Sequence, residues 1–132
     1  MTIKQISVFL ENKSGRLNHV TKVLADAGIN LDAFCIAETT DFGLLRLIVS
    51  DVDKAVEVLR KADVAVILTD VVCMECGNTP GSLAAILAAL AERGIFIEYM
   101  YAFSQAETTA KVIIRPNDLK ACMQVLSELE LA

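Results

Sequence analysis

The stretch Leu10–Leu17, with the sequence LENKSGRL, decides the fold because the chain contains a second copy of it. Cys76–Leu83, with the sequence CGNTPGSL, repeats its asparagine, its glycine and its final leucine at an offset of 66 residues, the distance from Gly15 to Gly81. Further pairs at this offset are Gly28–Ile29 with Gly94–Ile95 and Lys54–Ala55 with Lys120–Ala121. Because the length of 132 residues is twice this offset, we interpret the chain as two units, 1–70 and 71–132, that are related without an insertion.

The hydrophobic pattern of the first unit predicts the element order βαββαβ. Ile6, Val8 and Leu10 occupy alternate positions, as in a half-buried strand. Apolar residues at helical spacing come after the turn and end at Gly28, a residue typical of a helix C-terminus. Asp51 can cap the second helix. The predicted strands are 6–10, 29–39, 44–50 and 64–69, and the predicted helices are 17–27 and 52–62.

The second unit repeats this order but ends before its fourth strand. The predicted strands are 71–76, 95–103 and 108–114, and the predicted helices are 83–90 and 119–126. We expect an α+β architecture of two antiparallel sheets, each in the strand order 4-1-3-2 with its helices on one face. The last strand of the second unit is expected to be missing or very short, because its match would begin at 131. Another chain is expected to cover the edge beside Val71–Cys76, since exposed edges invite pairing.

Composition and charge exclude several classes of function. The net charge of -5 and the absence of a run of lysine and arginine argue against nucleic acid, which is bound by neutralising phosphates. The longest apolar run, Leu83–Ala91, is far shorter than the roughly 20 residues of a membrane span. The N-terminus lacks the pattern of a secretion signal, so we expect a cytoplasmic protein with reduced cysteines and no membrane partner.

Metal binding and catalysis are not expected either. Cys73 and Cys76 form a C-x-x-C motif within a strand, where residues three apart point to opposite faces. No second cysteine pair or nearby histidine completes a metal site, and we expect no cofactor. His19, the only histidine, is assigned to a solvated helix face, and no nucleophile with an orienting third group accompanies it. We therefore expect no catalytic residue.

Two longer stretches carry a resemblance to a known family. LENKSGRL is followed by AGINL at Ala27–Leu31, and CGNTPGSL is followed by RGIFI at Arg93–Ile97. This pattern resembles the ACT domain family, and the two-unit arrangement resembles stand-alone tandem ACT proteins over the whole chain. The resemblance implies two ferredoxin-like units with sheets packed side by side. It also implies amino acid binding between the loop after one first strand and the start of a partner's second strand, and hence a regulatory or sensor module. Exposed edges and bare sheet faces further predict a homodimer.

The candidate ligand site is formed around the two loops that lead into helices. Free amides at a helix start favour a carboxylate, and Gly15 and Gly81 allow close approach of the backbone. Asn12 and Asn78 offer both a donor and an acceptor to an amino acid, or alternatively only cap the turns. The predicted ligand-binding residues are Asn12, Ser14, Gly15, Arg16, Leu17, Asn30, Leu31, Asn78, Pro80, Gly81, Ser82, Leu83 and Phe96.

The two repeats differ at the strand start, where Asn30 of the first unit matches Phe96 of the second. We expect one site that combines Asn78 with Asn30. An alternative brings together Asn12 and Asn30 of two chains. The ligand side chain would point along the second strands, where Phe96 or Tyr99 offers a flat wall.

Other function classes stay open. Phe96 and the absent strand favour a structural or protein-interaction adaptor without ligand, and an enzyme on a ferredoxin-like frame is a third reading. Alternation would place Ile97, Tyr99, Tyr101 and Phe103 on one sheet face, either in the core or at an interface.

Overall fold

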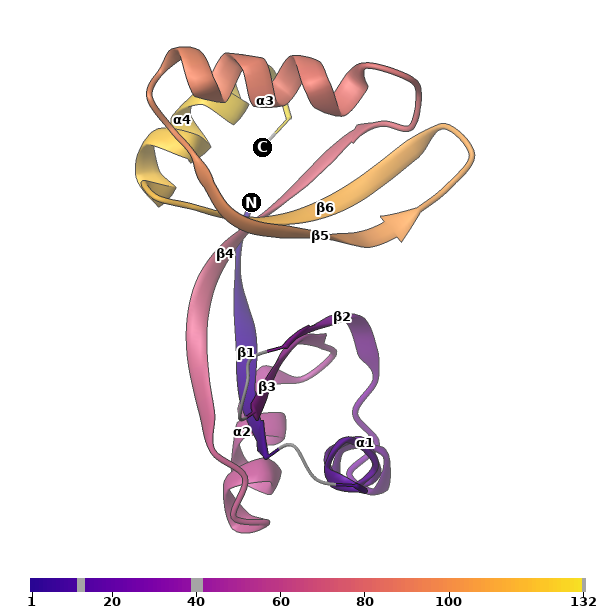
Figure 1. The fold of residues 1–132 in the computed structure, drawn as a ribbon. Coiled ribbons are helices and arrows are strands. Elements are labelled where there is room, and N and C mark those ends of the chain that lie inside the picture. The colour runs from indigo at the N-terminus through magenta and orange to yellow at the C-terminus, as the bar shows by residue number, and fades with distance from the viewer. Residues whose placement is uncertain (12–13, 39–41, 132) are drawn as a thin grey trace. The chain divides into compact units, whose positions relative to one another are not determined.

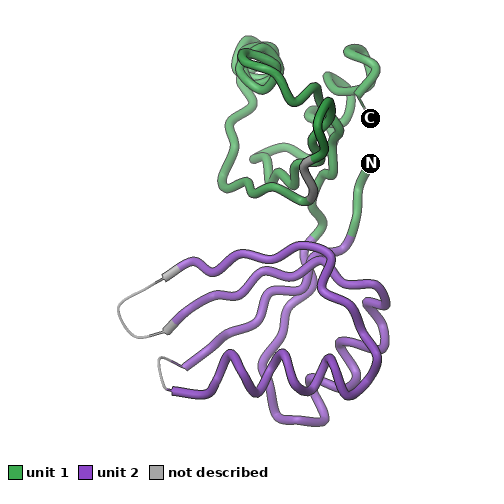
Figure 2. The backbone as a smooth tube through the Cα atoms, turned by 90° about the vertical axis from the view of Figure 1, so that its right-hand side faces the viewer, with its two compact units in different colours: residues 1–3, 70–132 green, residues 4–69 purple. Residues whose placement is uncertain are grey.

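The computed structural model describes residues 1–11, 14–38 and 42–131, and the chain forms two compact units. The N-terminal unit comprises Lys4–Thr69 (purple in Figure 2). The C-terminal unit comprises Asp70–Ala132 together with Met1–Ile3 from the start of the chain (green in Figure 2). Each unit is an antiparallel sheet with two helices, as the sequence predicts.

The N-terminal unit has the strand order β2-β3-β1-β4, which confirms the predicted order 4-1-3-2. Its elements are β1 (Thr2–Glu11), α1 (Arg16–Asp26), β2 (Leu31–Glu38), β3 (Phe42–Val49), α2 (Val52–Lys61) and the first part of β4 (Val66–Gly77). Strands β1 and β3 are antiparallel with Ile6 opposite Leu47 and Val8 opposite Leu45. These four side chains are buried under the helices, because alternate residues of a strand point to the same face.

The C-terminal unit repeats the arrangement in the order β1-β4-β6-β5. Its further elements are α3 (Ser82–Glu92), β5 (Ile97–Gln105), β6 (Thr109–Pro116) and α4 (Leu119–Glu128). Figure 1 shows α3 and α4 on the same side of these strands. The core lies between the two layers and includes Met74, Leu90, Ile114 and Leu126, each at most 1% exposed. Burying an aliphatic side chain of this size stabilises the fold by about 1.5–3 kcal/mol.

Strand β1 takes part in both units, which sequence analysis does not predict. The backbone nitrogen of Phe9 donates to the carbonyl of Ala65 at 3.1 Å within the N-terminal unit. At the other end of β1, the backbone nitrogen of Cys73 donates to the carbonyl of Met1 at 2.8 Å within the C-terminal unit. Residues 1–3 thus occupy the place of that unit's fourth strand.

The C-terminal unit ends differently from the N-terminal unit. Among the described residues, which run to 131, no strand follows α4, as predicted. Another chain was expected to cover the edge beside Val71–Cys76. This expectation is wrong at Cys73, because the backbone of Cys73 is hydrogen-bonded to Met1 of the same chain. The expectation failed because it treated the two units as separate stretches of sequence.

The repeat does contain an insertion, so the prediction of a constant offset is wrong. Gly28 and Gly94, which follow α1 and α3, have nearly equal φ angles of 72° and 71° at the offset of 66. Asp63 and Glu130, which follow α2 and α4, have φ angles of 59° and 60°, but they are one residue further apart. The similarity of Lys54–Ala55 to Lys120–Ala121 is therefore not a structural match.

The extra residue lies in β5. The pairing of β5 with β6 shifts between Ala102 and Ser104, as in a β-bulge, which adds one residue to one strand only. A second shift follows Ile97, whose side chain packs against the core. Tyr99 and Tyr101, which lie opposite Arg115 and Ile113, therefore share one sheet face as predicted. The shifts in pairing on either side interrupt the alternation, so the predicted face does not continue to Ile97 or Phe103.

Candidate ligand site

Helices α1 and α3 begin differently from α2 and α4. Asp51 and Asp118 precede α2 and α4, and their carboxylates accept hydrogen bonds from the first-turn amides at 3.1 and 3.0 Å. Gly15 and Gly81 precede α1 and α3, and neither start has a side-chain cap. Unpaired amides at a helix start carry partial positive charge and can hold an anion. The two loops that the sequence selects are thus the two helix starts without a side-chain cap, although the Ser82 amide at the start of α3 donates to the Thr79 carbonyl at 3.2 Å.

Gly15 and Gly81 adopt left-handed backbone conformations with φ angles of 83° and 86°. A Cβ atom at either position would meet no other atom within 4 Å. Glycine is therefore required by the backbone conformation, since residues with a Cβ atom rarely adopt it. The open space beside each glycine also leaves the adjoining helix start accessible.

The loop before α3 is held by hydrogen bonds of its own side chains. The Asn78 Nδ2 donates to the carbonyl oxygen of Ala106 at 2.7 Å, which ties the loop to the β5–β6 hairpin. The hydroxyls of Thr79 and Ser82 lie 2.6 Å apart across the turn. Asn78 thus stabilises the turn, which is the structural role that the sequence offered as an alternative. Because Nδ2 is bonded to Ala106, Oδ1 is the atom of the side-chain amide that can accept from a ligand.

The loop before α1 is described from Ser14 onward, so the prediction for Asn12 lies outside the described residues. Ser14, Gly15, Arg16 and Leu17 are all exposed. The Arg16 guanidinium lies 3.5 Å from the Glu11 carboxylate, measured from Nη2 to Oε2. In the other loop, Pro80 and Gly81 are exposed, and Ser82 and Leu83 are half-buried.

Asn30 and Phe96 occupy matching positions at the starts of β2 and β5. Their backbone nitrogens donate to Ser50 Oγ at 3.0 Å and Asn117 Oδ1 at 2.9 Å. Asn30 is exposed and its Nδ2 donates to the Asp32 carboxylate at 2.7 Å, whereas Phe96 is 61% exposed. The backbones of the two strand starts therefore match, but the exposed side chain is a polar amide in one unit and an aromatic ring in the other. Leu31 beside Asn30 is half-buried. The pairing of Asn30 with Asn78 joins residues of different units and stays a prediction.

Two of the four cysteines are buried and two are half-buried. Cys76 and Cys122 belong to the core of the C-terminal unit. Burial raises the pKa of Cys73 and of Cys122, so their thiolate fractions at neutral pH are small. Within the part of the chain that the structure describes, no group of three metal-ligating side chains is found, and no helix is long and apolar enough to cross a membrane.

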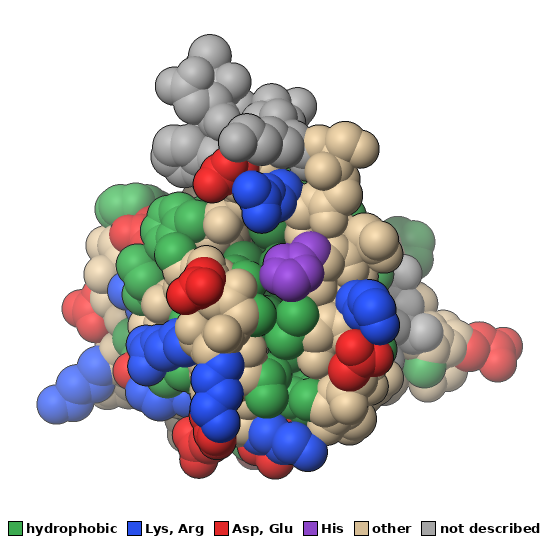
Figure 3. Space-filling model, turned by 90° about the horizontal axis from the view of Figure 1, so that it is seen from below, with side chains coloured by type: hydrophobic (Ala, Val, Ile, Leu, Met, Phe, Trp, Pro, Cys, Tyr) green, Lys and Arg blue, Asp and Glu red, His purple; other side chains and the backbone are tan. Residues whose placement is uncertain are grey.

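Sequence reasoning missed one feature beside the loop before α1. His19 is exposed, as its spacing predicts, and it also lines a cavity of the N-terminal unit together with Arg16. Figure 3 shows the histidine next to hydrophobic side chains, with acidic and basic side chains around them. The signal was absent from the sequence because the other side of the cavity comes from the turn after α2, more than 40 residues away.

Comparison with known proteins identifies the family. The sequence matches the family model described as the ACT domain pair over residues 1–131. The chain belongs to the ACT domain pair family. The resemblance seen in the two loop motifs, and the tandem ferredoxin-like fold that it implied, are thus confirmed.

Solved structures agree with this membership. Protein BT0572 from Bacteroides thetaiotaomicron is 53% identical, with a TM-score of 0.95 over 99% of this ACT domain pair and 90% of that chain. The ligand-free regulatory subunit of aspartate kinase from Thermus thermophilus is 20% identical, with a TM-score of 0.69 over 97% and 96% of the two chains. The regulatory subunit from Thermus flavus is also 20% identical, with a TM-score of 0.65 over 97% and 94%. The likeness to the two kinase subunits concerns the fold. No curated protein matches the chain.

Proposed function

We propose that this ACT domain pair is a non-catalytic regulatory module that binds an L-amino acid at the starts of α1 and α3. The observation that carries the proposal is the contrast between the four helix starts. Two are capped by aspartate, and the two that follow the family's loops have no side-chain cap and begin at an exposed glycine. The amides of these two starts would hold the ligand carboxylate.

The ligand ammonium needs acceptors, and the site residues supply them. Asn78 presents Oδ1 because its Nδ2 is bonded to Ala106. The sequence-based prediction adds the side chain of Asn30, whose neighbour Asp32 offers a carboxylate beside it. Phe96 is the flat wall that would favour an apolar or planar ligand side chain, since it is 61% exposed.

The proposed setting is the cytoplasm, which fits four free cysteines. A regulatory role is also consistent with the fold shared with regulatory subunits of aspartate kinase, although the likeness supports only the architecture.

We also propose that two copies associate through β2. This strand ends the sheet of the N-terminal unit, and its Phe34 and Ile36 side chains are 62% and 51% exposed. An edge strand with exposed apolar side chains favours pairing with another chain. Sedimentation should therefore show a dimer at micromolar concentration, and Phe34→Lys should shift it toward monomer. A wild-type monomer under these conditions would refute the association.

A thermal-shift panel of glycine and of the L and D forms of the other nineteen amino acids tests the proposed ligand class. A ligand present at 100 times its Kd stabilises the folded protein by about 2.7 kcal/mol, which is readily detected. We expect a stereospecific increase in Tm with at least one L-amino acid. The exposed Phe34 and Phe96 instead favour an adaptor that binds protein, and silence across the whole panel would support that second function.

A further inference from the structure

The cavity beside His19 has a volume of about 420 Å³ and lies entirely within the N-terminal unit. It is bounded by the end of β1, the first turns of α1 and the turn between α2 and β4. Its apolar wall includes Leu10 and Val20, which are buried, and Val64, which is half-buried. The volume falls within the range of small-molecule sites, about 300–1,000 Å³.

The polar rim of the cavity carries both signs of charge. Arg16 and Glu11 form an ion pair of 3.5 Å, with side chains 46% and 62% exposed, and Asp63 lines the cavity beyond α2. An exposed pair at this distance contributes little stability. The guanidinium therefore keeps donors for a carboxylate, which it can bind in a bidentate manner. A carboxylate at Asp63 can accept from an ammonium.

Glu11, Arg16 and His19 are specific to the N-terminal unit, whereas the carboxylate of Asp63 is matched by that of Glu130. At the offset of 66, Gly77, Ser82 and Ala85 of the C-terminal unit replace Glu11, Arg16 and His19. The helices of both units nevertheless begin with the same backbone conformation, at φ angles of 83° and 86°. The fold thus does not require the three charged or titratable side chains, which leaves them available for binding.

We propose that this cavity is a second ligand site, for a small zwitterion with an apolar body. The ligand carboxylate binds Arg16, its ammonium binds Asp63, and its body lies against Leu10, Val20 and Val64. This site adjoins the proposed amino acid site at the start of α1 and shares Arg16 with it, but its contacts are the side chains of Arg16 and Asp63 rather than backbone amides. The inference rests on the proposed function for its ligand class, and amino acid binding that does not depend on Asp63 would overturn this site while leaving the proposed function standing.

The only histidine of the chain reports on this cavity, because its ring gives a single set of imidazole signals in NMR. L-leucine is the probe, and isocaproate and isoamylamine are its analogues without the ammonium and without the carboxylate. We expect L-leucine to shift the His19 signal in a saturable manner, and each analogue to bind at least tenfold more weakly. An unmoved His19 signal, or an analogue that binds as tightly as leucine, would overturn the proposal.

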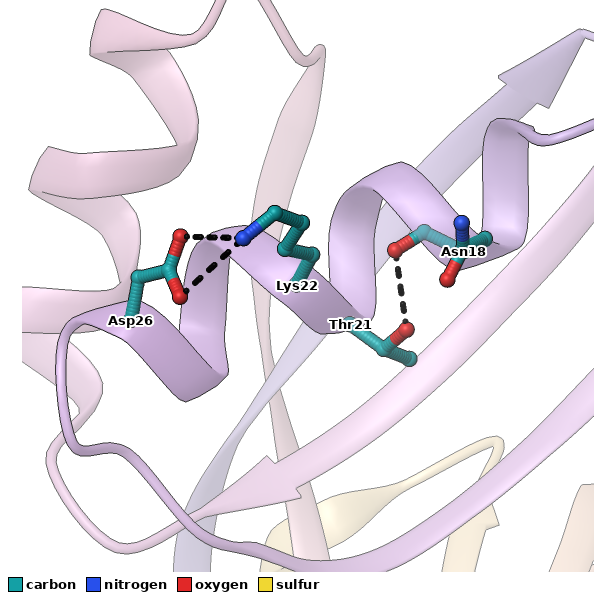
Figure 4. A network of polar contacts seen from close by, with 4 residues as sticks. All are labelled: Asn18, Thr21, Lys22 and Asp26. Atoms are coloured by element: carbon teal, nitrogen blue, oxygen red, sulfur yellow. Dashed lines mark hydrogen bonds and ion pairs between the residues drawn. The ribbon is translucent and has the colours of Figure 1, made fainter.

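Two variants with matched controls locate the contacts. Arg16→Ser introduces the residue of the other unit, and its control is Lys22→Ser, which removes a cation paired with Asp26 on the outer face of α1 at 3.0 Å (Figure 4). Neither Lys22 nor Asp26 lines the cavity. Figure 4 also shows the Thr21 hydroxyl, which donates to the carbonyl of Asn18 at 3.0 Å within the helix.

Asp63→Asn removes the second charge, and asparagine tolerates the φ angle of 59° at this position. Its control is Glu130→Gln, at the matching turn of the C-terminal unit with a φ angle of 60°. Both cavity variants should weaken leucine binding about tenfold or more, and both controls should stay within twofold. Equal affinity in Arg16→Ser and Lys22→Ser, or in Asp63→Asn and Glu130→Gln, would contradict the assigned contacts. Heat of leucine binding without any His19 shift would place the ligand elsewhere and overturn the site.

Discussion

Replacement of Gly81 by alanine should destabilise the protein through backbone conformation alone. Gly81 has a φ angle of 86°, and a Cβ atom there would meet no atom within 4 Å, so no steric clash adds to the cost. A residue with a Cβ atom in the left-handed region costs about 1–2 kcal/mol. Asparagine tolerates this region better, so Gly81→Asn should cost clearly less than Gly81→Ala.

Urea unfolding of the wild type and the two variants measures these costs, with the slope m expected to stay constant. In a thermal scan, 1 kcal/mol corresponds to roughly 2–8 °C for units and chains of this size. Gly77→Ala is an informative comparison, because its Cβ atom would lie 3.0 Å from Ser82 Oγ without a positive φ angle. Equal stability of Gly81→Ala and wild type, or a larger loss in Gly81→Asn than in Gly81→Ala, would refute the conformational reasoning.

Three further predictions concern a cap, the ligand and a thiol. Asp118→Ala should lower the free energy of unfolding by about 1 kcal/mol, measured by urea unfolding, because the first-turn amide of Ala121 loses its acceptor. Asn30→Ala should weaken amino acid binding roughly 10- to 150-fold in calorimetry, while Lys22→Ala, an exposed residue of α1 beyond its first turn, should not. Cys73 should be alkylated more slowly than free cysteine at pH 8, since burial raises its pKa. Mass spectrometry should show the alkylation rate of Cys73 still rising with pH where the rate of free cysteine has levelled off.

Periodicity was enough to predict the order of elements and the core. The alternation of Ile6, Val8 and Leu10 and the cap at Asp51 are local signals, and both appear in the structure. The 66-residue repeat likewise predicted equivalent glycines at Gly15 and Gly81 with matching φ angles. These features depend on residues that are close together in the sequence, so they can be inferred from one amino-acid sequence.

Features that depend on distant pairing were not predicted. Met1 pairs with Cys73, and no local pattern near either residue indicates which strand it will join. The bulge near Ala102 adds one residue to β5. Because hydrophobic residues are frequent on both faces of this strand, the hydrophobic pattern of the sequence does not reveal the change of offset. The cavity beside His19 was missed for the same reason, because Asp63 reaches it from another part of the chain.

For the candidate site, the sequence predicted which two loops precede the uncapped helices. It did not predict the hydrogen-bond partners of the side chains in those loops. The glycine requirement at Gly81 follows from the motif, and the structure adds the missing side-chain cap. The contact of Asn78 with Ala106 could not be foreseen, since it depends on how the β5–β6 hairpin returns to the loop.

Backbone amide shifts on addition of the amino acid that raises Tm most test the central claim most directly. The amides of 16–18 and 82–84 lie at the uncapped starts of α1 and α3, and those of 53–55 and 120–122 lie at the aspartate-capped starts of α2 and α4. The account predicts saturable shifts at one or both uncapped starts, with the capped starts unchanged. Shifts confined to the capped starts, or of equal size at all four, would contradict it.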